Sequence, residues 1–436
     1  MSKPQHTRTL WRRLKKNRLA AAAMVFLFVL VLLALLAPVI ANQKPLYAVY
    51  KGQTFYPVFS SKIKYTVTDP VTKEFEDIDI DKADWKQLKL ESVVWPLIPY
   101  SPGRSDLVNA NYISPKGKQE FKNADGKYVE MPSRFRHLLG TGVRGDDVLS
   151  GLIHGTRISL TVGLLSMLLA SLLGVVLGAT AGYFGDNSLR INRGGMVGFY
   201  ISLLPAWFYS FYVRSSVLGN ALSSSALAFI LHLLLSLFIL LIIILIITKV
   251  FASTLGRLPF FNKPTAIPFD SWLTRIIETV ISIPGIILII ALAAITQELT
   301  AAVIIVIGLT SWTGISRLIR AEMLKVRELD YIVAAKASGL KNAAIIFKHA
   351  LPNAIQPALV SMVFGVASAI LIESGLSFLG AFQIDSVTWG SMLAEGRSNF
   401  SAWWLVVFPG LMIFLTVTSL NILGEALRDE MDVREG

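Results

Sequence analysis

The stretch DYIVAAKASG at residues 330–339, followed by HALPN at 349–353, lies between two long apolar runs at 301–316 and 355–378. It carries charged residues and has the composition of a helix, and Gly339 stands where a left-handed cap would end that helix. A run of about 20 apolar residues is long enough to cross a bilayer as a helix. The sequence therefore predicts a short, water-exposed helical segment between two membrane spans.

Eight segments are long and apolar enough to span a membrane. The composition agrees, since 53% of the 436 residues are hydrophobic and only 16% are charged. The predicted spans are 19–41, 158–183, 195–213, 226–248, 279–296, 301–316, 355–378 and 403–423. The predicted fold class is an all-α membrane protein, a polytopic helical bundle of six core helices and two inserted ones, with a small β-rich extracytoplasmic insert.

Basic residues are divided unevenly among the short loops, although the net charge of +12 is spread along the chain. Loops on the side of the amino terminus hold Arg190, Arg193, Lys249, Arg257, Lys263, Arg275 and seven basic residues within 317–348, whereas loops on the other side hold Arg214 and Arg397. Cytoplasmic loops are the basic ones in membrane proteins, so both termini are expected in the cytoplasm. No single basic groove is evident, and nucleic acid is not expected as a partner.

The segment 42–136 is predicted to lie outside the cytoplasm. Ile63, Tyr65 and Val67 alternate with polar residues, as in a strand with one buried face, and Asp125-Gly126 is a hairpin-turn signal. The insert is either a solvated structural addition or a docking surface for a partner.

The predicted organisation is a basic amino terminus (1–18), a first helix (19–41), the insert (42–136), a segment with the second helix (137–185), an inserted transmembrane hairpin (186–270) and a core (271–436) with a cytoplasmic loop at 320–352. The first helix is expected to stay uncleaved, although Ala37 and Ala41 leave a signal-peptide cleavage site as the alternative.

The loop at 320–352 resembles the coupling loop of ABC importer permeases, because the spacing of Ala334, Ala335, Gly339, Leu351 and Pro352 matches the family pattern. In that family two short helices joined by a glycine turn insert into a cleft of the ATP-hydrolysing subunit. The resemblance implies ATPase-coupling residues at Glu322, Ala334, Ala335, Gly339, Ile346, His349, Leu351 and Pro352. We expect a first helix over 320–338 and a second one capped by Asn342 and stopped by Pro352. An ordinary amphipathic loop is the alternative.

Two further stretches resemble dipeptide and oligopeptide permeases. One is HLLGTGVRGDDVLSG at 137–151, in which Gly142, Asp146 and Gly151 stand for the family's Asp, Arg and Arg. The other begins with ESGLSFLG at 373–380 and continues through Trp389-Gly390 to residue 429. The chain is similar to the second, C-type permease subunit, with an enlarged outer loop. Residues 187–269 have no counterpart in that pattern.

Several ionisable residues near spans are candidate functional groups, because charge inside a bilayer is costly. Glu373 and Ser374 are predicted to face the pathway or to support an outer gate, whereas Glu278 and Glu298 are expected at the interfaces. His232 is expected to make a helix-packing contact. His137 and His154 lie near Asp146 and Asp147 and are either metal ligands or groups that make capping and surface hydrogen bonds. The second reading is favoured, because the spacing fits no standard metal site.

The chain has no phosphate-binding loop, nucleophile elbow or zinc helix, and it has no cysteine. We therefore expect no enzymatic activity and no cofactor on this chain, with ATP and Mg²⁺ bound by partner ATPase subunits. The resemblance implies import of peptides or related small solutes by alternating access across a bacterial inner membrane. It also implies a homologous permease subunit, two ATP-binding subunits, an extracytoplasmic solute-binding protein and membrane lipid as partners.

Three alternatives remain open. The solute of the permease could belong to another class, such as nickel or glutathione. A secondary transporter would carry inverted repeats or broken helices, which the sequence does not indicate. A membrane scaffold or sensor would use the outer segment for its function.

Overall fold

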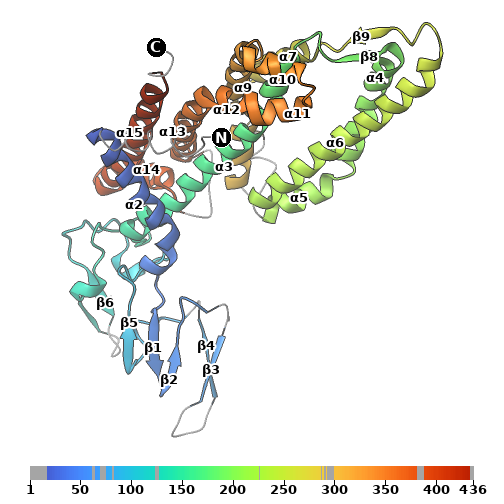
Figure 1. Ribbon diagram of the computed structural model, residues 1–436. Coiled ribbons are helices and arrows are strands. Elements are labelled where there is room, and N and C mark those ends of the chain that lie inside the picture. The colour runs from blue at the N-terminus through green and yellow to red at the C-terminus, as the bar shows by residue number, and fades with distance from the viewer. Residues whose placement is uncertain are drawn as a thin grey trace. The chain divides into compact units, whose positions relative to one another are not determined.

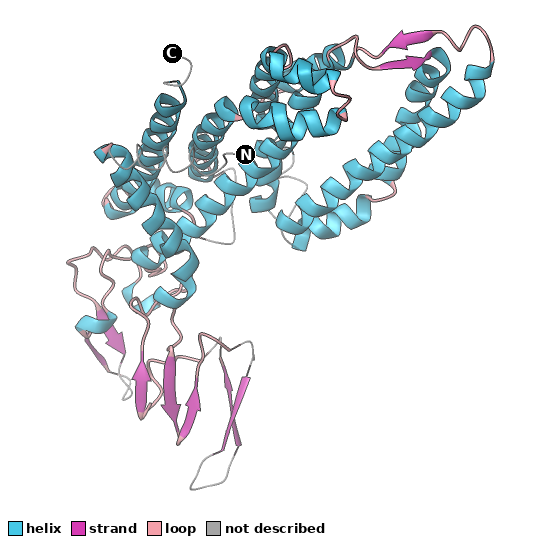
Figure 2. Cartoon of the chain, in the orientation of Figure 1, coloured by secondary structure: helices cyan, strands magenta, loops and turns pink. Residues whose placement is uncertain are grey.

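The computed structural model describes residues 17–60, 64–68, 75–80, 83–122, 127–224, 226–285, 287–288, 291, 299–380 and 387–432. These residues are mostly helical, and they include four small sheets (Figures 1 and 2). The predicted fold class, a helical membrane bundle with small sheets, is confirmed. The chain divides into two compact units, one of 162–369 with 421–436 and the amino-terminal 17 residues, the other of 18–161 with 370–420.

Six helices in the described part of the chain are long and apolar enough to cross a membrane, and a seventh span arises if one bent pair is counted. The six are α2 (Arg18–Ile40), α3 (Val148–Phe184), α6 (Ala226–Thr254), α9 (Leu299–Val326), α13 (Gln356–Phe378) and α15 (Trp404–Asp432). Each overlaps with one predicted span. Eight of the 18 residues of the predicted span 279–296 lie outside the described residues. Its first residues belong to α7 (Phe269–Ser282), which buries Leu273 and Ile277 on one face. The described residues thus contain six or seven of the eight predicted spans, and the span 279–296 stays a prediction.

The inserted hairpin has a bend that its sequence pattern did not predict. Its first arm consists of α4 (Arg193–Trp207), the π-helical turn Phe208–Tyr212 and α5 (Ser215–Ser224), with a change of direction of 42° before Ser215. Pro205 and the π turn are both recognised causes of such a bend. The segment 195–213, predicted as one span, thus corresponds to the first helix of the bent pair.

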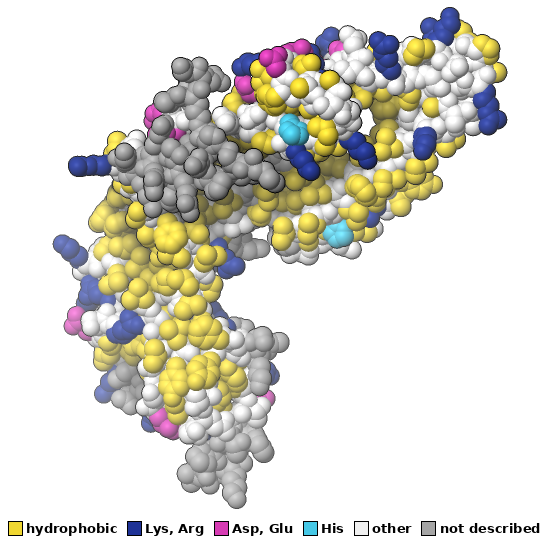
Figure 3. Space-filling view, viewed as in Figure 1, with side chains coloured by type: hydrophobic (Ala, Val, Ile, Leu, Met, Phe, Trp, Pro, Cys, Tyr) yellow, Lys and Arg dark blue, Asp and Glu magenta, His cyan; other side chains and the backbone are white. Residues whose placement is uncertain are grey.

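A two-stranded ribbon closes the base of this hairpin, where β8 (Arg190–Asn192) pairs antiparallel with β9 (Pro264–Ala266). Figure 3 shows hydrophobic side chains along the shaft of the hairpin, and Lys and Arg side chains around the end that carries the ribbon. Inside the hairpin His232 Nδ1 lies 3.4 Å from a guanidinium nitrogen of Arg214, which also donates to Ser236 Oγ at 3.0 Å. The predicted packing contact of His232 is therefore a polar one.

The described part of the β-rich segment contains three separate antiparallel sheets. The strand β1 (Tyr47–Tyr50) pairs with both β2 (Gln53–Phe55) and β5 (Ser92–Val94), β3 (Lys64–Thr68) with β4 (Phe75–Asp79), and β6 (Glu120–Lys122) with β7 (Tyr128–Glu130). One hydrophobic core in this segment consists of Ala48, Phe55, Val67, Ile78, Ile80 and Trp85. Ile63 and the predicted turn Asp125-Gly126 lie outside the described residues.

Candidate functional site

The predicted coupling loop folds as four short helical pieces between α9 and α13. They are α10 (Asp330–Ala337), α11 (Asn342–Ala344), the π-helical turn Ile345–Ala350 and α12 (Leu351–Ala354). The predicted single helix over 320–338 is wrong, since α9 ends at Val326 and a turn separates it from α10. The second helix also does not stop at Pro352. A π turn precedes this proline, which lies at the first or second position of α12, where proline is tolerated because its missing N–H leaves no helical bond unmade.

Gly339 ends α10 in the left-handed conformation that its position predicted, with φ at +74°. Its amide donates to the backbone oxygen of Lys336 at 3.0 Å, and the amide of Leu340 donates to Ala335 O at 3.3 Å. These two bonds form a Schellman motif, which satisfies the last carbonyl groups of the helix. The angle between α10 and the next helical piece therefore depends on one residue that prefers to be glycine.

The predicted cap at Asn342 is wrong. Asn342 is the first residue of α11, Lys341 occupies the cap position, and no side chain caps this amino terminus. The Asn342 Oδ1 atom instead accepts a hydrogen bond from the Tyr183 hydroxyl of α3 at 3.1 Å. A partner 159 positions away in the sequence has displaced the local bond.

The predicted coupling residues differ in their exposure. Ala334, Gly339, His349 and Pro352 are exposed, Glu322, Ala335 and Leu351 are half-buried, and Ile346 is only 4% exposed. Because its side chain packs inward beside Ile345, Ile346 stabilises the segment itself. Five large apolar side chains, by contrast, are between 41% and 58% exposed, and we name them the exposed apolar set: Leu329, Tyr331, Val333, Leu340 and Phe347. Only their exposure distinguishes them, and the sequence pattern did not single them out.

A seam of glycines joins α3 tightly to α9, the helix that leads into the coupling segment. Gly174, Gly178 and Gly182 follow each other at intervals of four residues on α3. A Cβ atom at Gly178 would lie 2.5 Å from Ser316 O, and one at Gly182 would lie 2.6 Å from Arg320 O. Small residues at this spacing let two helix backbones approach closely in a membrane. The two helices can therefore move as one body.

Polar contacts fix the coupling segment and its neighbours to this seam. A guanidinium nitrogen of Arg327 donates to Gly182 O at 3.2 Å, and Lys336 Nζ lies 4.9 Å from the centre of the Tyr183 ring. Arg320 forms a two-pronged ion pair with Asp270 at the start of α7. Two-pronged pairs of this kind hold a defined geometry.

Of the two glutamates predicted at the membrane interfaces, only Glu278 belongs to the described residues. Glu278 pairs with Arg275 at 3.2 Å on the surface of α7. Glu298 lies outside the described residues.

A cavity of about 340 Å³ opens beside the coupling segment. Its walls come from α9, from α12 and α13, and from the end of α15, and its polar lining residues are Glu322, Asn353, Gln356, Ser361 and Arg428. Asn353 also donates to the Tyr331 hydroxyl at 2.7 Å. Glu322, predicted as a coupling residue, thus lines this cavity, where it pairs with Lys325 at 2.8 Å. The hydrogen bond between Tyr331 of α10 and Asn353 thus links α10 directly to the cavity wall.

In the other unit, Glu373 is buried in a cage of hydroxyl groups. Its carboxyl oxygens lie 3.1 Å from Ser159 Oγ of α3, 3.2 Å from Ser374 Oγ and 3.2 Å from Ser377 Oγ, and the residue is 1% exposed. Hydrogen bonds are required here, since a buried carboxyl without partners is destabilising. Glu373 therefore joins α3 to α13 within this unit.

The short helix α14 (Trp389–Ser398) packs against the same two helices. The buried Trp389 donates from Nε1 to Leu152 O at 3.0 Å, and Gly155 leaves room for its ring, since a Cβ atom there would lie 2.8 Å from Trp389 Cδ1. A Cβ atom at Gly390 would lie 2.5 Å from Ser374 O. The motif stretches around residues 151, 374 and 390, far apart in sequence, are thus brought together.

Gly142 and Glu395 explain one departure from the permease pattern. Glu395 of α14 accepts a hydrogen bond from the Val143 amide at 2.6 Å, and a Cβ atom at Gly142 would lie 2.6 Å from Glu395 Oε1. Burial raises the pKa of the Glu395 carboxyl. A second carboxylate at position 142 would therefore meet both steric conflict and repulsion.

No group of three or more metal-ligating side chains is found among the described residues. His154 Nε2 lies 2.9 Å from Ala41 O, and the carboxylate of Asp147 accepts from the Ser150 amide at 2.6 Å, as a helix cap does. His137 is fully buried between two carboxylates, so the surface hydrogen bond expected for His137 is wrong.

Comparison with known proteins assigns this arrangement to a family. Residues 267–433, which contain the coupling segment, the cavity walls and α14, match the family model described as "Binding-protein-dependent transport system inner membrane component". Residues 7–57 match the "N-terminal TM domain of oligopeptide transport permease C". The chain belongs to this permease family. Its amino-terminal match places it with the C-type subunits, as the sequence resemblance predicted.

Individual relatives agree with this assignment of the permease. It is 26% identical to the inner membrane ABC transporter permease protein YejE of Escherichia coli, over 97% of this chain and 95% of that protein. It is 37% identical to the dipeptide transport system permease protein DppC of Alkalihalophilus pseudofirmus, over 42% of this chain and 60% of that protein. It is 27% identical to the glutathione transport system permease protein GsiD of Pectobacterium atrosepticum, over 74% of this chain and 80% of that protein.

Proposed function

We propose that the permease imports peptides or related small solutes, and that ATP hydrolysis on partner subunits drives it through the coupling segment. The observation that carries this proposal is the exposed apolar set on α10, on the turns at its two ends and on the π turn. Exposed apolar side chains in contact with water are unfavourable and commonly mark a protein interface. The peptide substrate is supported by the dipeptide permease among the relatives.

The mechanism we propose is alternating access by rigid transmission. Closure of two ATP-binding subunits moves α10, and the glycine seam carries the movement along α3 and α9. The cavity of 340 Å³ beside Asn353 and Glu322 serves as the cytoplasmic mouth of the pathway. Glu373 supports the outer gate. A ligand can shift such a two-state equilibrium only through its different affinity for the two states.

The same proposal assigns the partners and the chemistry. The pore consists of this permease and a homologous permease subunit, with two ATP-binding subunits in the cytoplasm and a solute-binding protein outside. ATP and Mg²⁺ bind to the ATPase subunits, and this chain carries no cofactor and hydrolyses nothing. Reconstitution of all these subunits in lipid vesicles, with a fluorescent tripeptide outside, tests the proposal. ATP-dependent accumulation supports it, and a transporter that accumulates glutathione or nickel but no peptide contradicts the substrate.

We expect both termini and the coupling segment to lie in the cytoplasm, because the basic loops are on that side. Single cysteines at Ser188, Asn262 and Ser338 should then stay unlabelled by a membrane-impermeant maleimide in intact cells, and one at Gly219 or Phe400 should react. The chain has no cysteine of its own, so each variant reports one position. Labelling of position 338 from outside would overturn both the orientation and the coupling role.

A further inference from the structure

The β-rich segment contains a cleft that the transport mechanism does not use. Its volume is 370 Å³, within the range of about 300–1,000 Å³ that small-molecule sites occupy. Apolar side chains such as Trp85, Phe121 and Met131 line it. Its charged lining residues are three cations, Lys86, Arg104 and Lys122, and three anions, Asp84, Asp106 and Glu120. The lining is thus balanced in charge, which suits a ligand that carries both signs.

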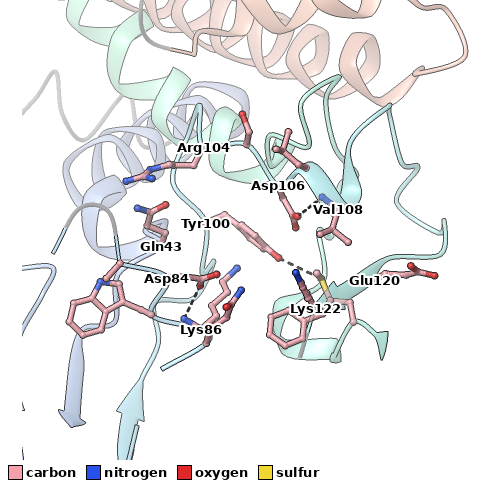
Figure 4. A pocket seen from close by; sticks show the side chains of 16 residues that line it. Gln43, Asp84, Lys86, Tyr100, Arg104, Asp106, Val108, Glu120 and Lys122 are labelled. Carbon is pink, nitrogen blue, oxygen red and sulfur yellow. Dashed lines mark hydrogen bonds between the residues drawn. The ribbon is translucent and has the colours of Figure 1, made fainter. Parts of the chain in front are cut away.

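Lys86 is the residue that decides what this ligand is. Its Nζ atom lies 3.4 Å from the centre of the Tyr100 ring and 5.2 Å from the centre of the Phe135 ring. Within the described residues, the ammonium group has no hydrogen bond or ion pair with a carboxylate. Figure 4 shows Lys86 and Asp84 on one side of Tyr100, and Asp106 and Lys122 on the other. Aromatic faces stabilise a partly buried cation less than an anionic partner does, so an external anion can stabilise this ammonium group further.

Two of the carboxylates near Lys86 are engaged by a buried histidine. Asp106 and Asp147 lie 3.2 Å and 2.9 Å from the two ring nitrogens of His137, and the His137 ring stacks on Tyr100 at 4.0 Å. Although burial opposes it, hydrogen bonding to Asp106 and Asp147 raises the pKa of His137. Asp84 accepts a hydrogen bond from the backbone amide of Lys86. Two acids are therefore committed to the histidine, whereas Asp84 is exposed and lines the cleft.

We propose that this cleft binds a small zwitterion, a free amino acid or the end of a short peptide, with its carboxylate on Lys86 and its ammonium group toward Asp84. The cleft is too small for a folded partner, and its apolar lining would accept a side chain. The inference is independent of the import role proposed above, because binding to the permease alone needs neither ATP nor the other subunits. A peptide ligand would also place a substrate-responsive site on the permease itself.

Protonation provides a distinctive signature of this site. Burial lowers the pKa of Lys86 to about 8, although Asp106, Asp84 and Asp147 oppose this effect, and Arg104, Lys122 and Glu120 also face the cleft. A carboxylate beside Nζ favours the charged form, so binding must raise that pKa. At a pH slightly above this pKa, binding should therefore take up protons from the buffer, and affinity should fall as the pH rises further.

The test uses the full-length permease in lipid nanodiscs and isothermal titration calorimetry at about pH 8.5, in two buffers that differ in ionisation enthalpy. The probes are dialanine, N-acetyl-dialanine and dialanine amide. We expect saturable binding of dialanine with proton uptake, weaker binding of the N-acetyl form, and none of the amide, which lacks the carboxylate. Lys86→Met should weaken dialanine binding at least about tenfold.

Lys86→Arg separates the proton taken up by the protein from that taken up by the ligand. The α-amino group of dialanine titrates in the same pH range, so it adds its own share of proton uptake. A guanidinium group stays charged throughout this range. Lys86→Arg should therefore bind dialanine with less proton uptake than the wild type, and the difference is the share of Lys86. Equal proton uptake in the two proteins would contradict the contact between the carboxylate and Lys86.

Lys89→Met is the matched control, because it removes an equal charge from an exposed position of the same segment and should bind as the wild type does. Thermal melting of each variant shows that the segment is folded. Absence of saturable dialanine binding to the folded wild type would overturn the proposal, as would equal affinity in Lys86→Met. Binding of the amide as strongly as dialanine would show that the carboxylate is not recognised. Because the readout is binding to the permease alone, failure of peptide uptake in vesicles would leave this proposal standing.

Discussion

Replacing Gly178 by alanine should reduce ATP-driven uptake at least about tenfold, together with the yield of folded permease. The added methyl group would lie 2.5 Å from the backbone oxygen of Ser316, and a backbone atom of a packed helix cannot move aside without its neighbours. Overpacking of this kind costs about 1–3 kcal/mol, and about 1.4 kcal/mol corresponds to a tenfold change. Melting of the purified permease and uptake into vesicles measure both effects.

Gly314→Ala in α9 provides the control, because a Cβ atom there would meet nothing within 4 Å. The two variants change glycine to alanine in adjacent helices, and alanine favours the helix in both cases. We expect Gly314→Ala to melt and transport like the wild type. Equal behaviour of the two variants would mean that the seam is looser than the described geometry and cannot transmit movement.

Changing Gly339 should uncouple the permease from its ATPase without unfolding it. The residue has a φ of +74°, and a Cβ atom there would meet nothing within 4 Å, so any effect must come from the backbone and not from a collision. A left-handed conformation costs an L-residue about 1–2 kcal/mol, less for asparagine and more for a β-branched side chain. The expected order of coupling is therefore glycine, asparagine, alanine and valine.

Valine at position 339 should lower substrate-stimulated ATP hydrolysis at least about tenfold, since a tilted α10 loses contacts across a packed interface. Hydrolysis by the isolated ATPase subunits should stay unchanged, and asparagine should recover most of the activity. Stimulated hydrolysis that is equal in the valine and glycine forms would show that this turn does not set the geometry of the interface.

Some features of the coupling segment could be predicted from the neighbouring residues in the sequence, and others could not. Gly339 could be predicted, because chirality alone makes glycine the favoured residue after a helix. The break between α9 and α10 could not be predicted, since the apolar pattern runs on through residues 324–335, and the contact of Arg327 with Gly182 O next to this turn is with a distant part of the sequence. Asn342 has the chemistry of a cap, yet Tyr183 is a competing partner from another helix.

The candidate sites also depend on contacts between residues that are far apart in the sequence. Glu373 was predicted from its depth in a span, but its cage includes Ser159, 214 positions away in the sequence. Only the structure shows that Ile346 is buried and Phe347 is exposed, because both side chains are large and apolar. Lys86 carried no motif at all, and its place over Tyr100 became evident only with the fold.

Cross-linking from position 347 to the ATP-binding subunit shows directly whether the coupling segment contacts that subunit. Phe347 is 58% exposed on the coupling segment, and Phe260, at the base of the hairpin, is 63% exposed and belongs to the same predicted side of the membrane. Each is changed to cysteine in the otherwise cysteine-free permease and labelled with a maleimide that carries a benzophenone. The labelled permease is assembled with its ATPase subunits and illuminated, so that the benzophenone can insert into a C–H bond of any residue in contact with it. We expect a cross-link from Phe347→Cys that blocks uptake, and none from Phe260→Cys. An assembled transporter that shows no cross-link from position 347 would contradict this expectation.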